Sequence, residues 1–97
     1  MPNPPPGFEW DERKAAWNLR VHRVSFAAVK DFDFSRSFKT EDLREDYGEE
    51  RIIALGKIGR TLHALIYTKA DQGPIRVISL RKANAKEREI YSAAGGQ

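Results

Sequence analysis

Side chains that could bind a polyanion such as RNA or DNA are concentrated in the second half of the chain. Residues 57–91 contain eight basic and three acidic residues, whereas residues 39–50 contain six acidic and two basic residues. This segregation suits a polyanionic partner, although charge alone favours an ordinary solvated surface. The candidate phosphate ligands are Lys57, Arg60, Arg76, Arg81, Lys82 and Arg88.

The other residue types limit the chemistry that the chain can perform. Cysteine is absent, which excludes disulfides, thiolate nucleophiles and cysteine-bound metals. With only His22 and His63, a multi-histidine zinc site is not expected, and we predict neither a metal ion nor a cofactor. Histidine suits proton exchange near neutral pH, so His63 is a candidate for proton transfer. The simpler assignment is a structural histidine within a strand.

The first half of the chain is predicted to form a short strand, two helices and an edge strand. Residues 8–10 predict a strand, and Asp11 is a typical N-cap for a helix that ends near His22. Ser25 is expected to begin a second short helix that ends near Phe32, and residues 35–40 are expected to form an edge strand. The expected buried line of the first helix is Ala15 and Leu19, and its polar stripe is Lys14, Asn18 and His22.

The second half predicts an antiparallel meander followed by a helix. Residues 51–58, 61–69 and 74–82 are rich in β-branched and bulky apolar residues and are separated by hairpin-sized linkers. Asn84 and Glu87 have the spacing of a capping box, which predicts a final helix that ends near Ala94. Its main apolar contact is expected to be Ile90.

The chain of 97 residues is long enough for one α+β domain with a modest core. We expect a flexible proline-rich lead at residues 1–7 and a single domain at residues 8–97. The sequence contains no apolar run of about 20 residues that could cross a membrane. Its N-terminus does not resemble a secretory signal, and a cytoplasmic location is expected.

Taken together, these segments resemble the BrnT family of bacterial type II toxins. The resemblance implies a RelE-like small sandwich, with an antiparallel sheet, two N-terminal helices and one C-terminal helix. One departure is Val21-His22-Arg23, where the family usually has Lys-His-Gly. The matching positions are Phe8-Glu9-Trp10-Asp11, Lys14, Asn18-Leu19, His22, Val24-Ser25-Phe26, Glu49-Glu50-Arg51, Gly56, Gly59-Arg60, Tyr67-Thr68, the run from Ile75 to Ala83, Glu87-Arg88 and Tyr91.

The resemblance also implies a function and partners. The family consists of metal-independent mRNA endoribonucleases that inhibit translation and growth. Its members are neutralised by BrnA, a ribbon-helix-helix antitoxin, and the complex of the two proteins binds operator DNA. Such a reaction needs a base for the 2′-hydroxyl, an acid for the leaving 5′-oxygen and cations around the phosphate. The candidate catalytic residues are Arg81, Glu87, His63 and Tyr91.

Each candidate also has a structural explanation. Arg81 can bind a phosphate through two parallel hydrogen bonds, or it can form a salt bridge with Glu87. Glu87 can act as the base, orient Arg81, or cap the final helix. Tyr91 can contact RNA or pack in the core. His22 is expected to cap the end of the first helix, with a catalytic role as the second alternative. Trp10 and Trp17 are assigned to the core and to a partner surface rather than to platforms for RNA bases.

Strand alternation restricts how the basic residues can combine. It places Arg81 and Lys82 on opposite faces of the sheet, and Arg76 on the face of Lys82, unless a bulge intervenes.

Two other functions remain open. The chain could be a non-catalytic module that binds RNA or protein, or a degenerate toxin that retains only antitoxin binding.

Overall fold

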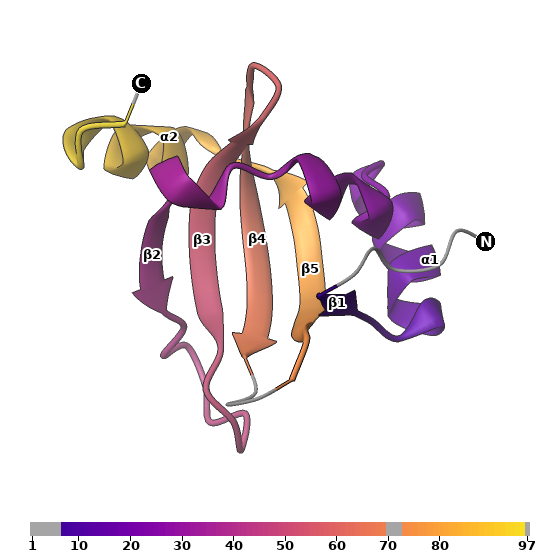
Figure 1. Cartoon of the computed structure of the whole chain (residues 1–97). Helices are drawn as coiled ribbons and strands as arrows, with labels where there is room; N and C mark the ends of the chain where they lie inside the picture. The colour runs from indigo at the N-terminus through magenta and orange to yellow at the C-terminus, as the bar shows by residue number, and fades with distance from the viewer. Residues whose placement is uncertain (1–6, 70–72, 97) are drawn as a thin grey trace.

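A five-stranded mixed sheet organises the molecule. The computed structural model describes residues 7–69 and 73–96, and its strand order is β1-β5-β4-β3-β2 (Figure 1). The predicted proline-rich lead lies outside these residues, apart from Gly7. In the part of the chain that is described, no helix is long and apolar enough to cross a membrane. The elements are β1 (Phe8–Glu9), α1 (Glu12–His22), the 3₁₀-helices η1 (Phe26–Asp31) and η2 (Phe34–Arg36), β2 (Phe38–Glu41), β3 (Ile52–Ile58), β4 (Thr61–Lys69), β5 (Ile75–Lys82) and α2 (Ala85–Ala93).

The predicted meander is confirmed, but the sheet is not entirely antiparallel. Strands β2, β3, β4 and β5 pair antiparallel in turn, and β1 pairs parallel with β5. The α+β class is therefore correct, whereas the all-antiparallel description is wrong. The second N-terminal helix begins after Ser25 as expected, and it is a 3₁₀-helix.

Helix α1 lies beside β5 at one edge of the sheet (Figure 1). Asp11 caps it by accepting hydrogen bonds from the backbone N–H groups of Arg13 and Lys14, as predicted. The helix ends at Arg23, whose φ of 61° lies in the left-handed region. That conformation favours glycine, so Arg23 adopts it at a cost in backbone strain.

The buried residue of α1 is Asn18, not Leu19 as predicted. Asn18 is 1% exposed and Leu19 is 50% exposed. The amide of Asn18 donates to the carbonyl oxygens of Leu80 (2.6 Å) and Val24 (3.0 Å), and its oxygen accepts from Leu80 N–H (3.3 Å). Since β1 is only two residues long, the outer edge of β5 has no strand beside it at Leu80, which pairs with Leu65 on its other side. Asn18 supplies the hydrogen bonds that such a strand would make.

The two faces of the sheet have separate apolar clusters. On the first face, η1 and the chain around it cover a cluster that includes Phe26, Leu65 and Leu80. On the second face, Tyr91 of α2 packs with Leu55 and Ala64. The main apolar contact of α2 is thus Tyr91 and not Ile90, which is exposed. The predicted capping box is present, because Asn84 and Glu87 exchange hydrogen bonds of 2.8 and 2.9 Å.

A bulge in β5 changes which side chains share a face. Ile66 pairs with Ser79 and Tyr67 pairs with Val77, so Ile78 is an extra residue in β5. Beyond the bulge, Arg81 lies opposite Ala64; before it, Arg76 lies opposite Thr68. Ala64 and Thr68 share one face of β4. Arg76 therefore lies on the face of Arg81, and the prediction that it shares the face of Lys82 is wrong.

Candidate functional site

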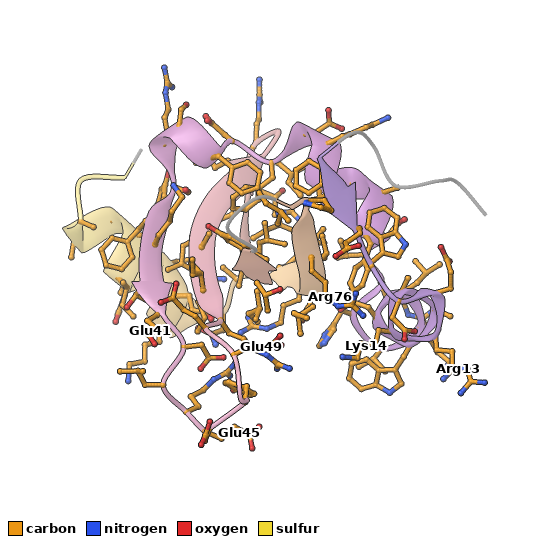
Figure 2. The ribbon with its side chains drawn as sticks, turned by 60° about the horizontal axis from the view of Figure 1, so that its bottom comes forward. Arg13, Lys14, Glu41, Glu45, Glu49 and Arg76 are labelled. Carbon is orange, nitrogen blue, oxygen red and sulfur yellow. The ribbon has the colours of Figure 1, made fainter. Side chains whose placement is uncertain are left out.

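A pocket of about 450 Å³ lies on the second face of the sheet, between α1, the loop that joins β2 to β3, and β5. We call it the arginine pocket. Figure 2 shows the elements that form two of its sides: the loop, which carries Glu45 and Glu49, and α1, which carries Arg13 and Lys14. The residues that line it are Trp17, His22, Arg44, Glu45, Tyr47, Arg51, Ile66, Ile78, Ser79 and Arg81.

Arg81 and Glu87 form a two-pronged ion pair at this pocket. The Nη1 and Nη2 atoms of Arg81 donate to the two carboxylate oxygens of Glu87 at 2.7 and 2.9 Å. Glu87 also accepts from the N–H of Asn84, so it caps α2 and orients Arg81 at the same time. The hydrogen bond from Arg81 is the main cause that holds the pKa of Glu87 below its usual value. Glu87 thus caps the final helix and also orients Arg81, the two structural roles that the sequence offered for it.

Arg44 is a second oriented guanidinium, and the sequence analysis did not select it. Its Nε and Nη2 atoms donate to Asp42 at 2.8 Å each, and the hydroxyl of Tyr47 donates to the same carboxylate at 3.0 Å. The Asp42 side chain is 0% exposed, whereas that of Arg44 is 62% exposed. The hydrogen bonds from Arg44 hold the pKa of Asp42 far below its usual range. The only signal in the sequence is an arginine within an acidic run.

Arg51 is held both by an aromatic ring and by a carboxylate, since its Nε atom lies 3.5 Å from the carboxylate of Glu49. Its guanidinium carbon lies 3.9 Å from the centre of the Tyr47 ring, a favourable cation–π distance. The loop is closed by a hydrogen bond of 2.7 Å from the N–H of Asp42 to the carbonyl of Arg51. The acidic segment at residues 41–50 therefore positions two of the three arginines that line the pocket.

Trp17 and His22 of α1 form the opposite wall. Their ring centres are 5.6 Å apart and the ring planes are nearly perpendicular, at 82°. Trp17 is 51% exposed, so it is not a core residue, whereas Trp10 packs against the core as predicted. His22 is the last residue of α1. Its place in the pocket makes it a candidate for proton transfer as well as for capping.

The other predicted catalytic residues lie elsewhere. His63 is buried and pairs with Gly56 and Lys82. It lies on the first face, opposite from Arg81, and its Nδ1 is 2.9 Å from the carbonyl oxygen of Thr61. The hydroxyl of Tyr91 donates to the carbonyl oxygen of Arg36 at 3.2 Å. The structure therefore brings Arg81 and Glu87 together, and neither His63 nor Tyr91 lines the arginine pocket.

The predicted phosphate ligands do not form one patch. Arg60 is exposed at the β3–β4 turn, and Lys82 is exposed on the first face. Arg76 is 3.8 Å from Glu9, and Arg88 donates to the carbonyl oxygen of Ala83. Lys57 lines a different pocket. Of the six, only Arg81 lines the arginine pocket.

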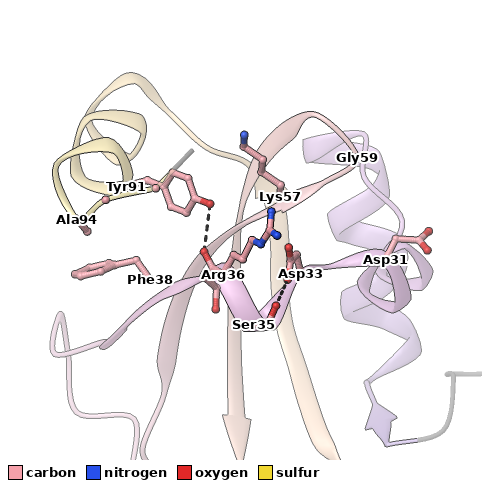
Figure 3. Close-up of a pocket in the computed structure, with 12 residues that line it drawn as sticks. Asp31, Asp33, Ser35, Arg36, Phe38, Lys57, Gly59, Tyr91 and Ala94 are labelled. Atoms are coloured by element: carbon pink, nitrogen blue, oxygen red, sulfur yellow. Dashed lines mark hydrogen bonds between the residues drawn. The ribbon is translucent and has the colours of Figure 1, made fainter.

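That different pocket, which we call the hairpin pocket, has a volume of about 1000 Å³. It lies between the 3₁₀-helix η2, the β3–β4 hairpin and the end of α2 (Figure 3). Tyr91 and Arg36 are joined across it by the hydrogen bond described above, and Ser35 donates to Asp33 at 2.7 Å. Its charged lining residues are Asp31, Asp33, Arg36 and Lys57.

Comparisons with known proteins agree on one family. A family model described as "Ribonuclease toxin, BrnT, of type II toxin-antitoxin system" matches residues 10–87. The fold is similar to the crystal structure of the ribonuclease toxin BrnT of Brucella abortus, with a TM-score of 0.65 and 26% sequence identity. That match covers 79% of this chain and 95% of the Brucella chain. No match was found among curated proteins.

Proposed function

The chain belongs to the BrnT family of ribonuclease toxins of type II toxin–antitoxin systems, and from this premise we propose that it cleaves mRNA without a metal ion in the arginine pocket. The observation that supports this assignment is the pair of arginines held by carboxylates. Glu87 fixes Arg81 and Asp42 fixes Arg44, each through two hydrogen bonds. Oriented guanidinium groups can stabilise the charge that develops on a phosphate during cleavage.

The reaction needs only the RNA, these arginines and one side chain that takes up and delivers protons. The 2′-oxygen attacks the adjacent phosphorus, a new O–P bond forms, and the bond from phosphorus to the 5′-oxygen breaks. One proton leaves the 2′-hydroxyl and one is added to the 5′-oxygen. The products are a 2′,3′-cyclic phosphate and a 5′-hydroxyl. Arg81 and Arg44 stabilise the five-coordinate phosphorus in this scheme.

His22 is the proposed proton-transfer residue, and Glu87 is a positioning residue. Histidine suits both removal and delivery of a proton near neutral pH, and His22 lines the pocket with Arg81. Glu87 is a poor base because Arg81 lowers its pKa. This assignment replaces the predicted catalytic roles of His63 and Tyr91, which lie outside the pocket.

The family also suggests what controls the activity. A type II system pairs a toxin with a protein antitoxin, so we propose that a BrnA-like ribbon-helix-helix protein neutralises this chain in the cytoplasm. Operator DNA would be bound only through that complex. Growth arrest on expression of the chain, relieved by co-expression of the antitoxin, is the expected result.

Incubation of the purified chain with total RNA in EDTA tests the proposed activity. Wild type is compared with Arg81→Ala and with Lys82→Ala, which removes the neighbouring positive charge on the opposite face; all three are matched for thermal stability. Cleavage by wild type and Lys82→Ala, lost in Arg81→Ala, is the expected pattern. Salt-sensitive RNA binding without turnover would instead indicate a non-catalytic module. Intact RNA without binding would indicate a degenerate toxin.

A further inference from the structure

The arginine pocket contains a large aromatic surface that the proposed reaction does not use. Trp17 lies in the middle of α1, and about half of its surface is exposed although it lines the pocket. Its contact with His22 is edge-to-face, so the two rings are not stacked on each other. An exposed indole next to arginines is typical of surfaces that bind single-stranded nucleic acid, where bases stack on aromatic rings and cations hold the backbone.

The rest of the pocket is suited to a flat, apolar group that is attached to a charged group, as a base is to its phosphate. Ile66, Ile78 and Ser79 line it between the two walls. The bulge in β5 places both Ile78 and Ser79 on this face. On the loop side, the Tyr47 ring already bears the Arg51 guanidinium, which leaves Trp17 as the better-exposed aromatic face.

We propose that Trp17 is the stacking platform for one unpaired nucleobase, whose adjoining phosphate is held by Arg81 and Arg44. The volume of about 450 Å³ lies within the range of about 300–1,000 Å³ for small-ligand pockets. A base must leave its helix before it can stack on a protein ring, so this subsite selects single-stranded RNA. The inference rests on the proposed function, because it names the substrate class of the same pocket.

Binding of a non-cleavable RNA isolates this contact from catalysis. The probe is a fluorescein-labelled, fully 2′-O-methylated single strand, which lacks the attacking hydroxyl, and its affinity is measured by fluorescence anisotropy at fixed salt. The variants are Trp17→Phe, Trp17→Leu and Leu19→Ala. Leu19 is the matched control, since it is an equally exposed apolar residue of the same helix and does not line the pocket.

Loss of one base–aromatic stack weakens binding by about 5- to 150-fold. We expect a loss in this range for Trp17→Leu, a small loss for Trp17→Phe, which keeps an aromatic face, and none for Leu19→Ala. A duplex of the same length should bind more weakly and be insensitive to Trp17→Leu. The proposal is wrong if Trp17→Leu binds the single strand with wild-type affinity, or if Trp17→Phe and Trp17→Leu lose the same affinity. It is also wrong if the duplex binds as tightly as the single strand.

The cleavage assay separates this proposal from the proposed function. If wild type cleaves RNA and Trp17→Leu binds the probe normally, the stacking platform is wrong and the ribonuclease assignment stands. If wild type leaves RNA intact but Trp17→Leu loses affinity for the probe, the pocket binds single strands without cleaving them. Failure of wild type to bind the single strand overturns the stacking platform directly.

Discussion

The two pockets of the molecule differ in how their charged side chains are held. The hairpin pocket is the larger, and within residues 7–69 and 73–96 its cations Arg36 and Lys57 form no ion pair with a carboxylate. In the smaller arginine pocket, Arg81 and Arg44 are each fixed by a carboxylate and Arg51 lies on a ring. Pocket volume alone would favour the hairpin pocket. Charged groups that are already oriented stabilise a transition state without having to move during the reaction. This criterion favours the arginine pocket as the candidate active site.

The largest expected difference between the pockets is in toxicity. Arg81→Ala should relieve growth arrest on expression, because loss of one oriented donor at a developing charge reduces turnover by about 10²–10³-fold. Arg36→Ala removes an arginine from the hairpin pocket and should remain as toxic as wild type. Growth curves at matched protein levels measure both. Relief of arrest by Arg36→Ala alone would move the active site to the hairpin pocket.

A second difference is expected in stability. Asp42→Ala removes a buried carboxylate that accepts hydrogen bonds from Arg44 and Tyr47, which should cost about 1–3 kcal/mol in the free energy of unfolding. Asp33→Ala in the hairpin pocket removes a carboxylate bonded to the exposed Ser35 and should change stability by less than about 0.5 kcal/mol. Urea denaturation compares the two. Equal losses would show that the Asp42 pair has no special role in holding the loop.

The Arg81–Glu87 pair predicts a dependence of stability on pH. Because the pKa of Glu87 lies below its usual 4.5 in the folded chain, its carboxylate stabilises the fold above that pH, and this contribution is lost as the pH falls through the lowered pKa. Glu87→Gln should therefore be less stable than wild type near neutral pH, with a smaller difference at about pH 3. Urea denaturation at both pH values measures this. A constant difference would mean that Arg81 does not lower the pKa of Glu87.

The smallest expected effect is on the salt dependence of RNA binding. Each phosphate contact to a single strand contributes about 0.7 to the slope of log affinity against log salt. Arg44→Ala should lower the slope by about this amount, and Arg36→Ala should leave it unchanged. Titrations of the 2′-O-methylated single strand at several salt concentrations give the slopes. An equal decrease of the slope for Arg44→Ala and Arg36→Ala would indicate that RNA is attracted by the overall positive charge, without a specific phosphate contact at Arg44.

Local signals in the sequence predicted much of the fold. The Asp11 cap, the three long strands and the capping box at Asn84 and Glu87 are determined by neighbours within a few residues, and all are present. Asn18 was misassigned to a polar stripe because its burial depends on Leu80, far along the chain. Periodicity within a helix gives no information about an unpaired strand edge.

The candidate site depends still more on distant contacts. Arg81 and Glu87 were selected from the sequence and do meet. Arg44 was missed, because an arginine in an acidic run is indistinguishable from a solvated one until the burial of Asp42 is known. The position of Arg76 was predicted wrongly because alternation fails at the bulge beside Ile78. No local pattern in β5 marks that bulge.

The central claim is that the arginine pocket cleaves RNA without a metal ion. Its most direct test is cleavage of a labelled single-stranded RNA in EDTA by wild type, Arg81→Ala and Lys82→Ala, with analysis of the ends produced. The account predicts 2′,3′-cyclic phosphate ends for wild type and Lys82→Ala, and uncleaved RNA for Arg81→Ala. Cleavage by Arg81→Ala at the wild-type rate, or cleavage by wild type only after a divalent metal is restored, would contradict it.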